Sequence, residues 1–215
     1  MPLWRSGTGH CSIYSGDEKN INIEEGVTII VGEELQLCAM DDCIQPTDKI
    51  ICIPEKLRET VETVKMPDTV RVIGGKSFKH FKNLKEVEFS SNLEIIKVSA
   101  FLGCESLKTL HLPKSLKKIE AWAFGNIEVE DIYFDGSIIE FEKIDIEKYQ
   151  RSFDSIGKVH CEDCVVDFKQ EKFYISELAY KGTMEECKSD IGSTWIYEKS
   201  SKINCSDGQI DNTKA

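Results

Sequence analysis

Hydrophobic residues recur along the middle of the chain at a constant interval of 23 residues. The clearest column contains Phe78, Phe101 and Phe124. Three more columns keep the same phase: Val70, Leu93 and Leu116; Ile73, Ile96 and Ile119; and Pro67, Ser90 and Pro113. A fixed period of this length is typical of structural repeats that bury their apolar side only by stacking on one another. The pattern therefore predicts a solenoid.

A short run of alternating apolar and polar residues closes each repeat. Such alternation is typical of a strand with one buried side. The runs are residues 51–54, 64–67, 87–90, 110–113 and 132–134. Between them, residues 76–81, 99–103 and 121–124 have room only for turns, 3₁₀ helix or short helices. We expect an α/β repeat solenoid with short parallel strands on one face and these turns on the other.

Three irregularities interrupt the period. Leu35 lies upstream at the spacing of the Phe column, so we expect it to continue that column. Only 13 residues separate Pro54 from Pro67, which predicts a coil that lacks its middle. The last coil is one residue short, so Val129 is expected where Leu84 stands in an earlier coil.

The repeat residues resemble a known motif. The run Leu107-x-x-Leu110-x-Leu112-Pro113-x-x-Leu116-x-x-Ile119-x-x-x-Ala123-Phe124 is similar to the leucine-rich repeat of the bacterial BspA-like (Treponema-type) subclass. The segment Ala100-Phe101-Leu-Gly-Cys104 matches the Ala-Phe-x-x-Cys turn of that subclass. The resemblance covers roughly residues 21–135 and implies a leucine-rich-repeat fold.

A second internal repetition begins after residue 135, where the 23-residue period stops. Gly-Ser-Ile-Ile-Glu-Phe at 136–141 aligns with Gly-Thr-Met-Glu-Glu-Cys at 182–187. In both segments a Ser or Thr precedes a Glu by three residues, which is the signature of a capping box at a helix N-terminus. The segments Cys161-Glu-Asp163 and Cys205-Ser-Asp207 also align. Each unit therefore predicts a short amphipathic helix followed by an extended segment.

These two units resemble the C-terminal flanking modules of gut-bacterial members of the family. A tryptophan stands in those modules where Phe141 and Cys187 stand here, so we expect looser packing in the second unit. A terminal module of this kind covers strand edges that would otherwise be exposed. The expected organisation is a flank (1–20), a solenoid of four to five coils (21–135), β-rich caps (136–166 and 167–211) and a tail (212–215).

The net charge of −11 and the pI of about 5.0 argue against nucleic-acid binding, which needs a basic face. No stretch is long and apolar enough for membrane insertion. The N-terminal sequence does not read as a signal peptide. We therefore expect a cytoplasmic monomer, or a secreted or cell-surface protein if the N-terminus has been trimmed.

The nine cysteines raise the alternative of a metal or redox site. Cys161 and Cys164 form half of a zinc-ribbon or redox pattern, and Cys187 and Cys205 could complete four thiolate ligands. However, Cys161 and Cys205 occupy equivalent positions of separate units, which places them apart. We expect no metal, no cofactor, no obligatory disulfide and mostly buried thiols, with Cys52 as the exposed exception.

No catalytic motif is apparent. The four histidines are scattered, and the chain lacks a Gly-x-Ser-x-Gly elbow and a Gly-x-x-x-x-Gly-Lys phosphate loop. Residues 207–211 lack the ligand density and closing Glu of a calcium loop. We expect a protein that is not an enzyme.

The outward side of the predicted strands is the remaining candidate surface. Alternation places Cys52, Lys65, Glu88, His111 and Tyr133 in a central outward column. Neighbouring columns would hold Ile50, Thr63, Glu86, Thr109 and Asp131, and Lys49, Glu62, Lys85, Lys108 and Glu130. The candidate partner-binding residues are Lys65, Lys85, Glu88, Lys108, His111, Asp131 and Tyr133.

Solenoids usually present such a surface to a partner. We therefore expect a non-catalytic module that binds an unidentified protein or glycan. Two alternatives stay open. The surface can be an ordinary solvated polar face, because its charges are of mixed sign and Tyr133 is its single aromatic anchor. The chain can also be a structural spacer or surface-adhesin fragment.

Overall fold

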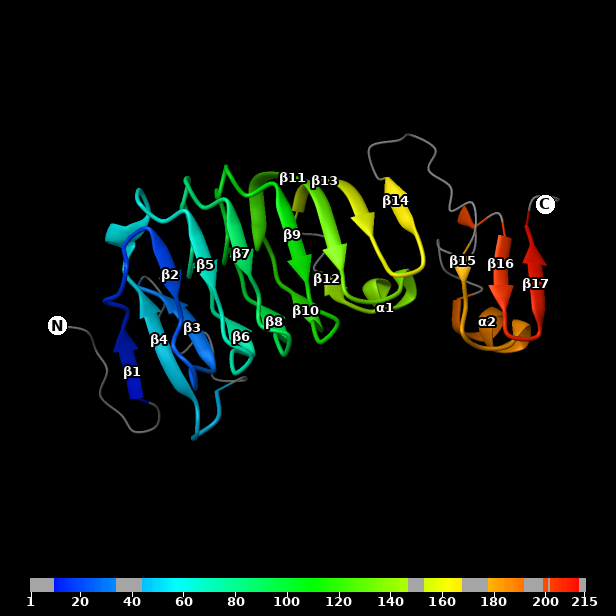
Figure 1. Ribbon diagram of the computed structural model, residues 1–215, viewed down its shortest axis with the longest axis horizontal. Helices are drawn as coiled ribbons and strands as arrows, with labels where there is room; N and C mark the ends of the chain where they lie inside the picture. Colours follow the sequence, from blue (N-terminus) through cyan, green and yellow to red (C-terminus); the bar gives the residue numbers. More distant parts are fainter. Residues whose placement is uncertain are drawn as a thin grey trace.

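The chain forms an elongated stack of coils whose short strands lie side by side along one axis (Figure 1). The computed structural model describes residues 10–33, 44–146, 153–167, 178–191, 199–200 and 202–212. Two rows of parallel strands run along the stack, and few helices accompany them. The architecture is therefore a solenoid of stacked parallel strands, as the 23-residue period predicts.

One row is a seven-stranded parallel sheet. Its order is β1 (His10–Ile13), β4 (Lys49–Ile53), β3 (Ile29–Gly32), β6 (Val72–Ile73), β8 (Ile95–Ile96), β10 (Lys118–Ile119) and β12 (Asp145–Ile146). Several of these strands are only two residues long. They come from segments that lack clear alternation, so we had expected turns there. The prediction of strands on one face only is wrong, because two-residue pairings leave too little pattern to detect.

The other row contains the strands that the alternating runs predict. It comprises β2 (Asn20–Asn22), β5 (Thr63–Lys65) and β7 (Glu86–Glu88), then β9 (Thr109–Leu112), β11 (Phe124–Phe134) and β13 (Phe153–His160). Pairing is parallel within each group of three, and β9 lies beside β7. The antiparallel strand β14 (Val165–Asp167) follows β13. We call the solvent side of this row the strand face.

The third side of each coil consists of turns that bond to the next coil. The Phe78 N–H donates to the carbonyl of Ala100, and the Phe101 N–H donates to the carbonyl of Ala123, both at 2.8 Å. Lys76, Ser99 and Trp122 begin the equivalent turns with φ angles of 58°, 56° and 57°. A left-handed conformation costs a non-glycine residue roughly 1–2 kcal/mol. The ladder of bonds between coils holds these turns in place.

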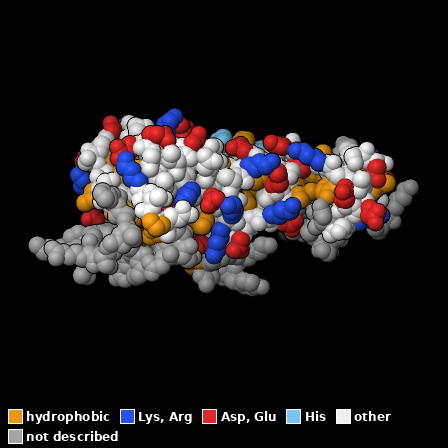
Figure 2. Space-filling view, turned by 90° about the horizontal axis from the view of Figure 1, so that it is seen from below, with side chains coloured by type: hydrophobic (Ala, Val, Ile, Leu, Met, Phe, Trp, Pro, Cys, Tyr) orange, Lys and Arg blue, Asp and Glu red, His pale blue; other side chains and the backbone are white. Residues whose placement is uncertain are grey.

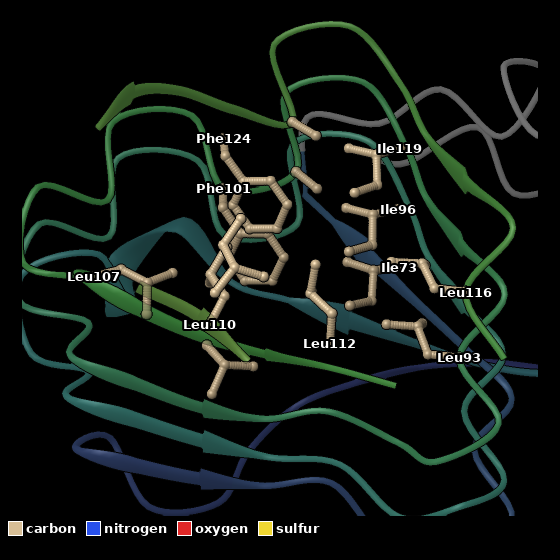
Figure 3. Packing of buried hydrophobic residues seen from close by; sticks show 14 of the residues in the cluster. Ile73, Leu93, Ile96, Phe101, Leu107, Leu110, Leu112, Leu116, Ile119 and Phe124 are labelled. Carbon is tan, nitrogen blue, oxygen red and sulfur yellow. The ribbon is translucent and has the colours of Figure 1, made fainter. Parts of the chain in front are cut away.

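The hydrophobic columns meet in the interior, as predicted. The ring centroids of Phe78 and Phe101 are 5.2 Å apart and those of Phe101 and Phe124 are 5.3 Å apart, with nearly parallel planes. Figure 3 shows the Ile73, Ile96 and Ile119 column beside these rings. All of these side chains are fully buried. Leu35, the expected continuation of the stack, lies outside the described residues.

Smaller positions of the core also follow the repeat. Val129 is fully buried where Leu84 stands in an earlier coil, so the prediction for the short coil is confirmed. Cys104 is buried in the column that it shares with Phe81 and Ile127. The repeat therefore predicts interior positions correctly, even where the residue type changes.

The short interval between Pro54 and Pro67 has a different cause from the one expected. The run at 51–54 belongs to β4, which lies in the seven-stranded sheet between β1 and β3. A short 3₁₀ helix at Glu55–Leu57 follows β4, and the chain then reaches β5 in the other row. The interval is thus the connection between two rows, and the interpretation as a shortened coil is wrong.

Parallel stacking continues past residue 135. Residues of β13 pair with β11, with Val159 opposite Ile132, and Ile146 of β12 pairs with Ile119 of β10. The interval from Ile132 to Val159 is 27 residues, because this coil contains helix α1 (Ile138–Glu142). The boundary expected at 135 therefore separates two sequence patterns, while the strand rows run across it.

Both predicted capping boxes form. In α1, Ser137 and Glu140 exchange backbone-to-side-chain hydrogen bonds of 2.9 and 3.3 Å. Hydrogen bonds from Lys114 and from the Ser137 backbone lower the pKa of Glu140 to about 2. In α2 (Met184–Ile191), Thr183 and Glu186 make the same exchange at 2.8 and 3.2 Å.

The two units repeat one further contact. The backbone N–H of Ile138 donates to Asp163 at 2.9 Å, and that of Met184 donates to Asp207 at 2.7 Å. In the second unit, β15 (Leu178–Ala179) pairs with β16 (Lys202–Cys205), which forms a hairpin with β17 (Gly208–Asp211). The structure thus agrees with the internal alignment of the two segments.

Candidate interaction surface on the strand face

The central outward column of the strand face contains five of the predicted positions in altered company. The register aligns Asn22, Lys65 and Glu88 across β2, β5 and β7, and aligns His111, Tyr133 and His160 across β9, β11 and β13. Cys52 does not belong to this column. It pairs with Val31 in the seven-stranded sheet and is only 5% exposed, so its predicted place was wrong.

The neighbouring columns need the same correction at their N-terminal end. The second column contains Asn20, Thr63, Glu86, Thr109, Asp131 and Lys158. The third contains Lys19, Glu62, Lys85, Lys108 and Glu130, whose backbones are linked by hydrogen bonds between successive coils. Ile50 and Lys49, which we had placed in these columns, lie in β4 of the other sheet. The error follows from assigning β4 to the wrong row.

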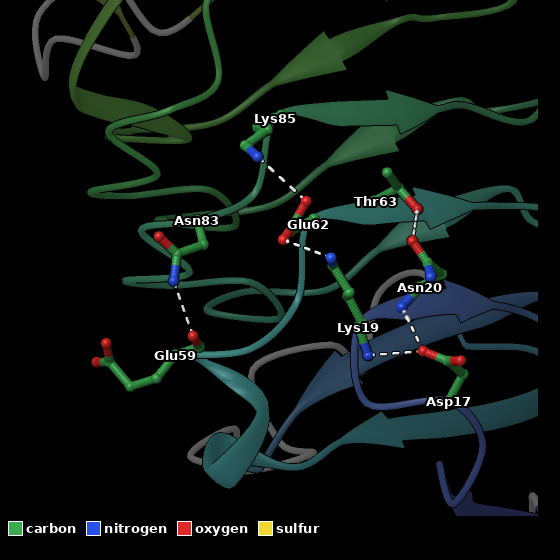
Figure 4. Close-up of polar contacts among 8 residues, drawn as sticks. All are labelled: Asp17, Lys19, Asn20, Glu59, Glu62, Thr63, Asn83 and Lys85. Atoms are coloured by element: carbon green, nitrogen blue, oxygen red, sulfur yellow. Dashed lines mark hydrogen bonds and ion pairs between the residues drawn. The ribbon is translucent and has the colours of Figure 1, made fainter.

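The N-terminal half of the strand face, formed by β2, β5 and β7, contains mutually paired charges. Figure 4 shows Glu62 between two ammonium groups, with Lys19 at 3.0 Å and Lys85 at 3.1 Å. Hydrogen bonds from these two lysines lower the pKa of Glu62. Lys65 and Glu88 form an ion pair of 2.5 Å, and the hydrogen bond from Glu88 raises the pKa of Lys65. Much of the charge on this half is therefore compensated locally.

The C-terminal half, formed by β9, β11 and β13, contains three stacked rings. The ring centroids of His111 and Tyr133 are 4.9 Å apart with planes at 10°, and those of Tyr133 and His160 are 4.4 Å apart with planes at 12°. We call these three residues the ring column. Tyr133 is 39% exposed, which is high for a large aromatic side chain in an ordered strand. His160 Nε2 lies 2.7 Å from Asp131 Oδ1, which orients the imidazole.

Carboxylates flank the ring column on both sides. Asp131 lies on one side, and Asp135 and Glu162 lie on the other, in adjacent coils that are joined by a hydrogen bond from the Glu162 N–H to the Gly136 carbonyl. Among the described residues, neither Asp135 nor Glu162 forms an ion pair, and both are exposed. This half therefore differs from the N-terminal half in having uncompensated negative charge beside aromatic rings.

Charges of both signs cover other parts of the surface. Figure 2 shows lysine, arginine and acidic side chains interspersed over the face seen from below. The view shows no extended basic area, as expected for a chain of net charge −11. Such a surface offers little to a polyanion.

The described cysteines have little thiolate character. Burial raises the pKa of Cys52 to about 11 and that of Cys164 to about 12. Burial also raises the pKa values of Cys104 and Cys161. A thiolate is the form that reacts or binds metal, so these pKa shifts disfavour both. The expectation of an exposed, reactive Cys52 was wrong because that residue lies between two strands of a sheet.

A metal centre finds no support among the residues that the structure describes. Within them, no group of three or more His, Cys, Asp or Glu side chains could hold an ion. The seven cysteines in those ranges are free thiols. In the same part of the chain, no helix is long and apolar enough to cross a membrane.

Sequence reasoning missed His160 and Lys158 on the strand face. The signal was available, because Ile132-Tyr133 and Val159-His160 are both apolar–aromatic pairs at the end of a strand. The 27-residue interval between them hid the relation, since the search used a period of 23. Lys19 and Asn22 were missed because β2 is followed by irregular coils.

Comparison with protein families yields one match. The model of the BspA type leucine-rich repeat region, in six copies, matches residues 55–179. This range contains β5 to β14, including the ring column. The comparisons with curated proteins and with solved structures found no match.

Proposed function

This chain belongs to the BspA-type leucine-rich repeat family, and on that premise we propose that it is a non-catalytic module that binds a protein partner through its strand face. The leucine-rich-repeat solenoid is a fold commonly used for protein–protein interaction. Because a fold does not by itself define a function, the proposal needs support from the surface of this chain.

The observation that carries the proposal is the exposed ring column. Tyrosine is among the residues enriched in the energetic centres of protein interfaces. Here Tyr133 is held between two imidazole rings on a strand whose inward side chains, including Ile132 and Phe134, are buried. A side chain that is already ordered loses less conformational entropy on binding. The strand face thus offers a rigid aromatic anchor.

Two further readings of the molecule stay as alternatives. A glycan partner would need rings whose faces are free for stacking, and Tyr133 is covered on both faces. A structural spacer or surface adhesin would need no anchor on the strand face. The ring column therefore favours a protein partner over both.

The proposal is tested by capture of partners with matched surface variants. Tyr133→Ala and Trp122→Ala each remove an exposed aromatic side chain, because Tyr133 is 39% and Trp122 is 37% exposed. Trp122 lies on the turn side of the coil, away from the strand row. We expect Tyr133→Ala, and the triple substitution of Lys65, His111 and Tyr133 by Ala, to lose specific partners from the native lysate.

Trp122→Ala should retain those partners. Identical capture by the wild type and the triple variant would contradict the proposal. Loss with Trp122→Ala alone would place binding on the turn side instead. Thermal unfolding of each variant has to be recorded alongside, so that loss of folding is not mistaken for loss of binding.

A further inference from the structure

We propose that the C-terminal half of the strand face docks an extended segment of a partner protein that carries lysine or arginine side chains. This inference rests on the proposed function and makes it more specific. It assigns the binding centre to the ring column and the chemical character of the partner to cationic. The N-terminal half is assigned no part in recognising the cation.

The first argument is the distribution of unpaired charge. In the N-terminal half, Lys65 is paired with Glu88, and Glu62 is held between two lysines. In the C-terminal half, Asp135 and Glu162 are exposed and form no ion pair with any described residue. A cationic side chain would therefore gain two carboxylate partners without displacing an existing pair.

The second argument concerns the other charges around the rings. Lys158 lies beside Asp131 in the register, and Lys108 lies next to Glu130 in the third column. Both ammonium groups are on the Asp131 side of the ring column. On the Asp135 side, Lys114 is engaged with Glu140 at 2.9 Å. The negative potential is therefore directed to the side of Asp135 and Glu162, which is where we place the cation.

The third argument comes from the geometry of the rings. Stacking at 4.4 and 4.9 Å covers both faces of Tyr133, so its edge and hydroxyl group meet the solvent. A row of ring edges with hydroxyl and imidazole groups suits the polar backbone and aliphatic side-chain stems of a peptide. It does not suit a sugar ring, which stacks on an open aromatic face.

Synthetic peptides of alternating Arg and Thr residues provide the probe, with alternating Glu and Thr, and alternating Gln and Thr, as comparators. Binding to the full chain is followed by amide NMR shifts and by titration. We expect the Arg peptide to shift the amide signals of β9, β11 and β13, and those of β5 and β7 much less. The two comparator peptides should bind at least about tenfold more weakly.

A matched pair of double variants separates specific docking from general attraction to an acidic protein. Asp135→Asn with Glu162→Gln neutralises the proposed site, whereas Glu59→Gln with Glu86→Gln makes the same charge change in the N-terminal half. We expect the first pair to weaken Arg-peptide binding by about tenfold and the second to leave it within about twofold. All four positions are exposed, so unchanged thermal unfolding should accompany both results.

Equal weakening by the two double variants would overturn the inference, as would equal binding of the Glu or Gln peptide. Shifts of the same amide signals by a neutral β-linked glucose oligomer, with none by the Arg peptide, would favour a glycan and also overturn it. The proposed function fails separately, when Tyr133→Ala leaves partner capture unchanged. If capture depends on Tyr133 and not on Asp135 and Glu162, the function stands and the inference of a cationic partner falls.

Discussion

The two halves of the strand face share one scaffold and differ in what they present. Beneath both, the stack of Phe78, Phe101 and Phe124 runs through consecutive coils with nearly constant ring spacing. Outside, the N-terminal half places Lys65 opposite Glu88, whereas the C-terminal half places Tyr133 between two imidazoles. Positions that are equivalent in the repeat thus form an ion pair in one half and an aromatic stack in the other.

This difference teaches where the information specific to this chain lies. An interior side chain meets the same residue type in the coils before and after it, so close packing keeps its size and shape nearly constant. An outward side chain meets water and its lateral neighbours, which accept many residue types. The repeat therefore explains the fold, and departures from it on the strand face indicate the function.

The largest expected effect is on the shared scaffold. Phe101 is fully buried between two rings and also contacts Phe89 edge-on at 5.8 Å. Phe101→Ala should lower the free energy of unfolding by about 3–5 kcal/mol, because a large cavity opens in the core. Chemical denaturation measures this, with Tyr133→Ala as a surface control expected to cost about 1 kcal/mol or less. A cost below about 1 kcal/mol for Phe101→Ala would contradict a common core under both halves.

A smaller change should affect the C-terminal half alone. A Cβ atom on Gly157 would lie 2.1 Å from the backbone oxygen of Glu130, so β11 and β13 can approach only with glycine at this position. Gly157→Ala should cost about 1–3 kcal/mol, as overpacking does elsewhere. Hydrogen exchange should speed up in β11 and β13 and stay unchanged in β5 and β7.

Lys158→Ala is the control for Gly157, because Lys158 is the exposed neighbour on the same strand and its loss should change stability by no more than about 0.5 kcal/mol. Equal acceleration of exchange in both halves would show that they do not respond separately. It would remove the basis for treating them as two regions.

The smallest effects compare the two kinds of lateral contact directly. Double-mutant cycles to Ala on His111 with Tyr133, and on Lys65 with Glu88, measure couplings in the same outward column. We expect about 0.5 kcal/mol or more for the stacked rings and about 0.2–1 kcal/mol for the exposed ion pair. Raising the salt concentration should weaken only the ion-pair coupling, because salt screens exposed charges. Salt dependence of the ring coupling would mean that charge, and not stacking, joins His111 to Tyr133.

Much of the interior could be predicted from residue spacing. The Phe column, the place of Val129 and the burial of Cys104 all follow from the phase of each residue within a coil. Both capping boxes were also predictable, because Ser137 with Glu140 and Thr183 with Glu186 act within one turn of helix. Interactions between residues close in sequence leave a direct signature in it.

The composition of the strand face could be predicted only in part. Alternation correctly placed Lys65, Glu88, His111 and Tyr133 with their side chains outward. It could not tell that β4 joins the other sheet, because an alternating strand fits either row equally well. The partners of each strand depend on the path of the chain through the intervening coil.

The amino-acid sequence by itself therefore determined the repeat, the buried columns and the local caps, because each depends on apolar residues at fixed phase or on neighbours along the chain. Only the tertiary structure decided that His160 completes the ring column and that Cys52 is buried. Those outcomes depend on coils of unequal length coming into hydrogen-bonded register. Register is set by packing between coils, and residue spacing does not encode it when the spacing changes from 23 to 27.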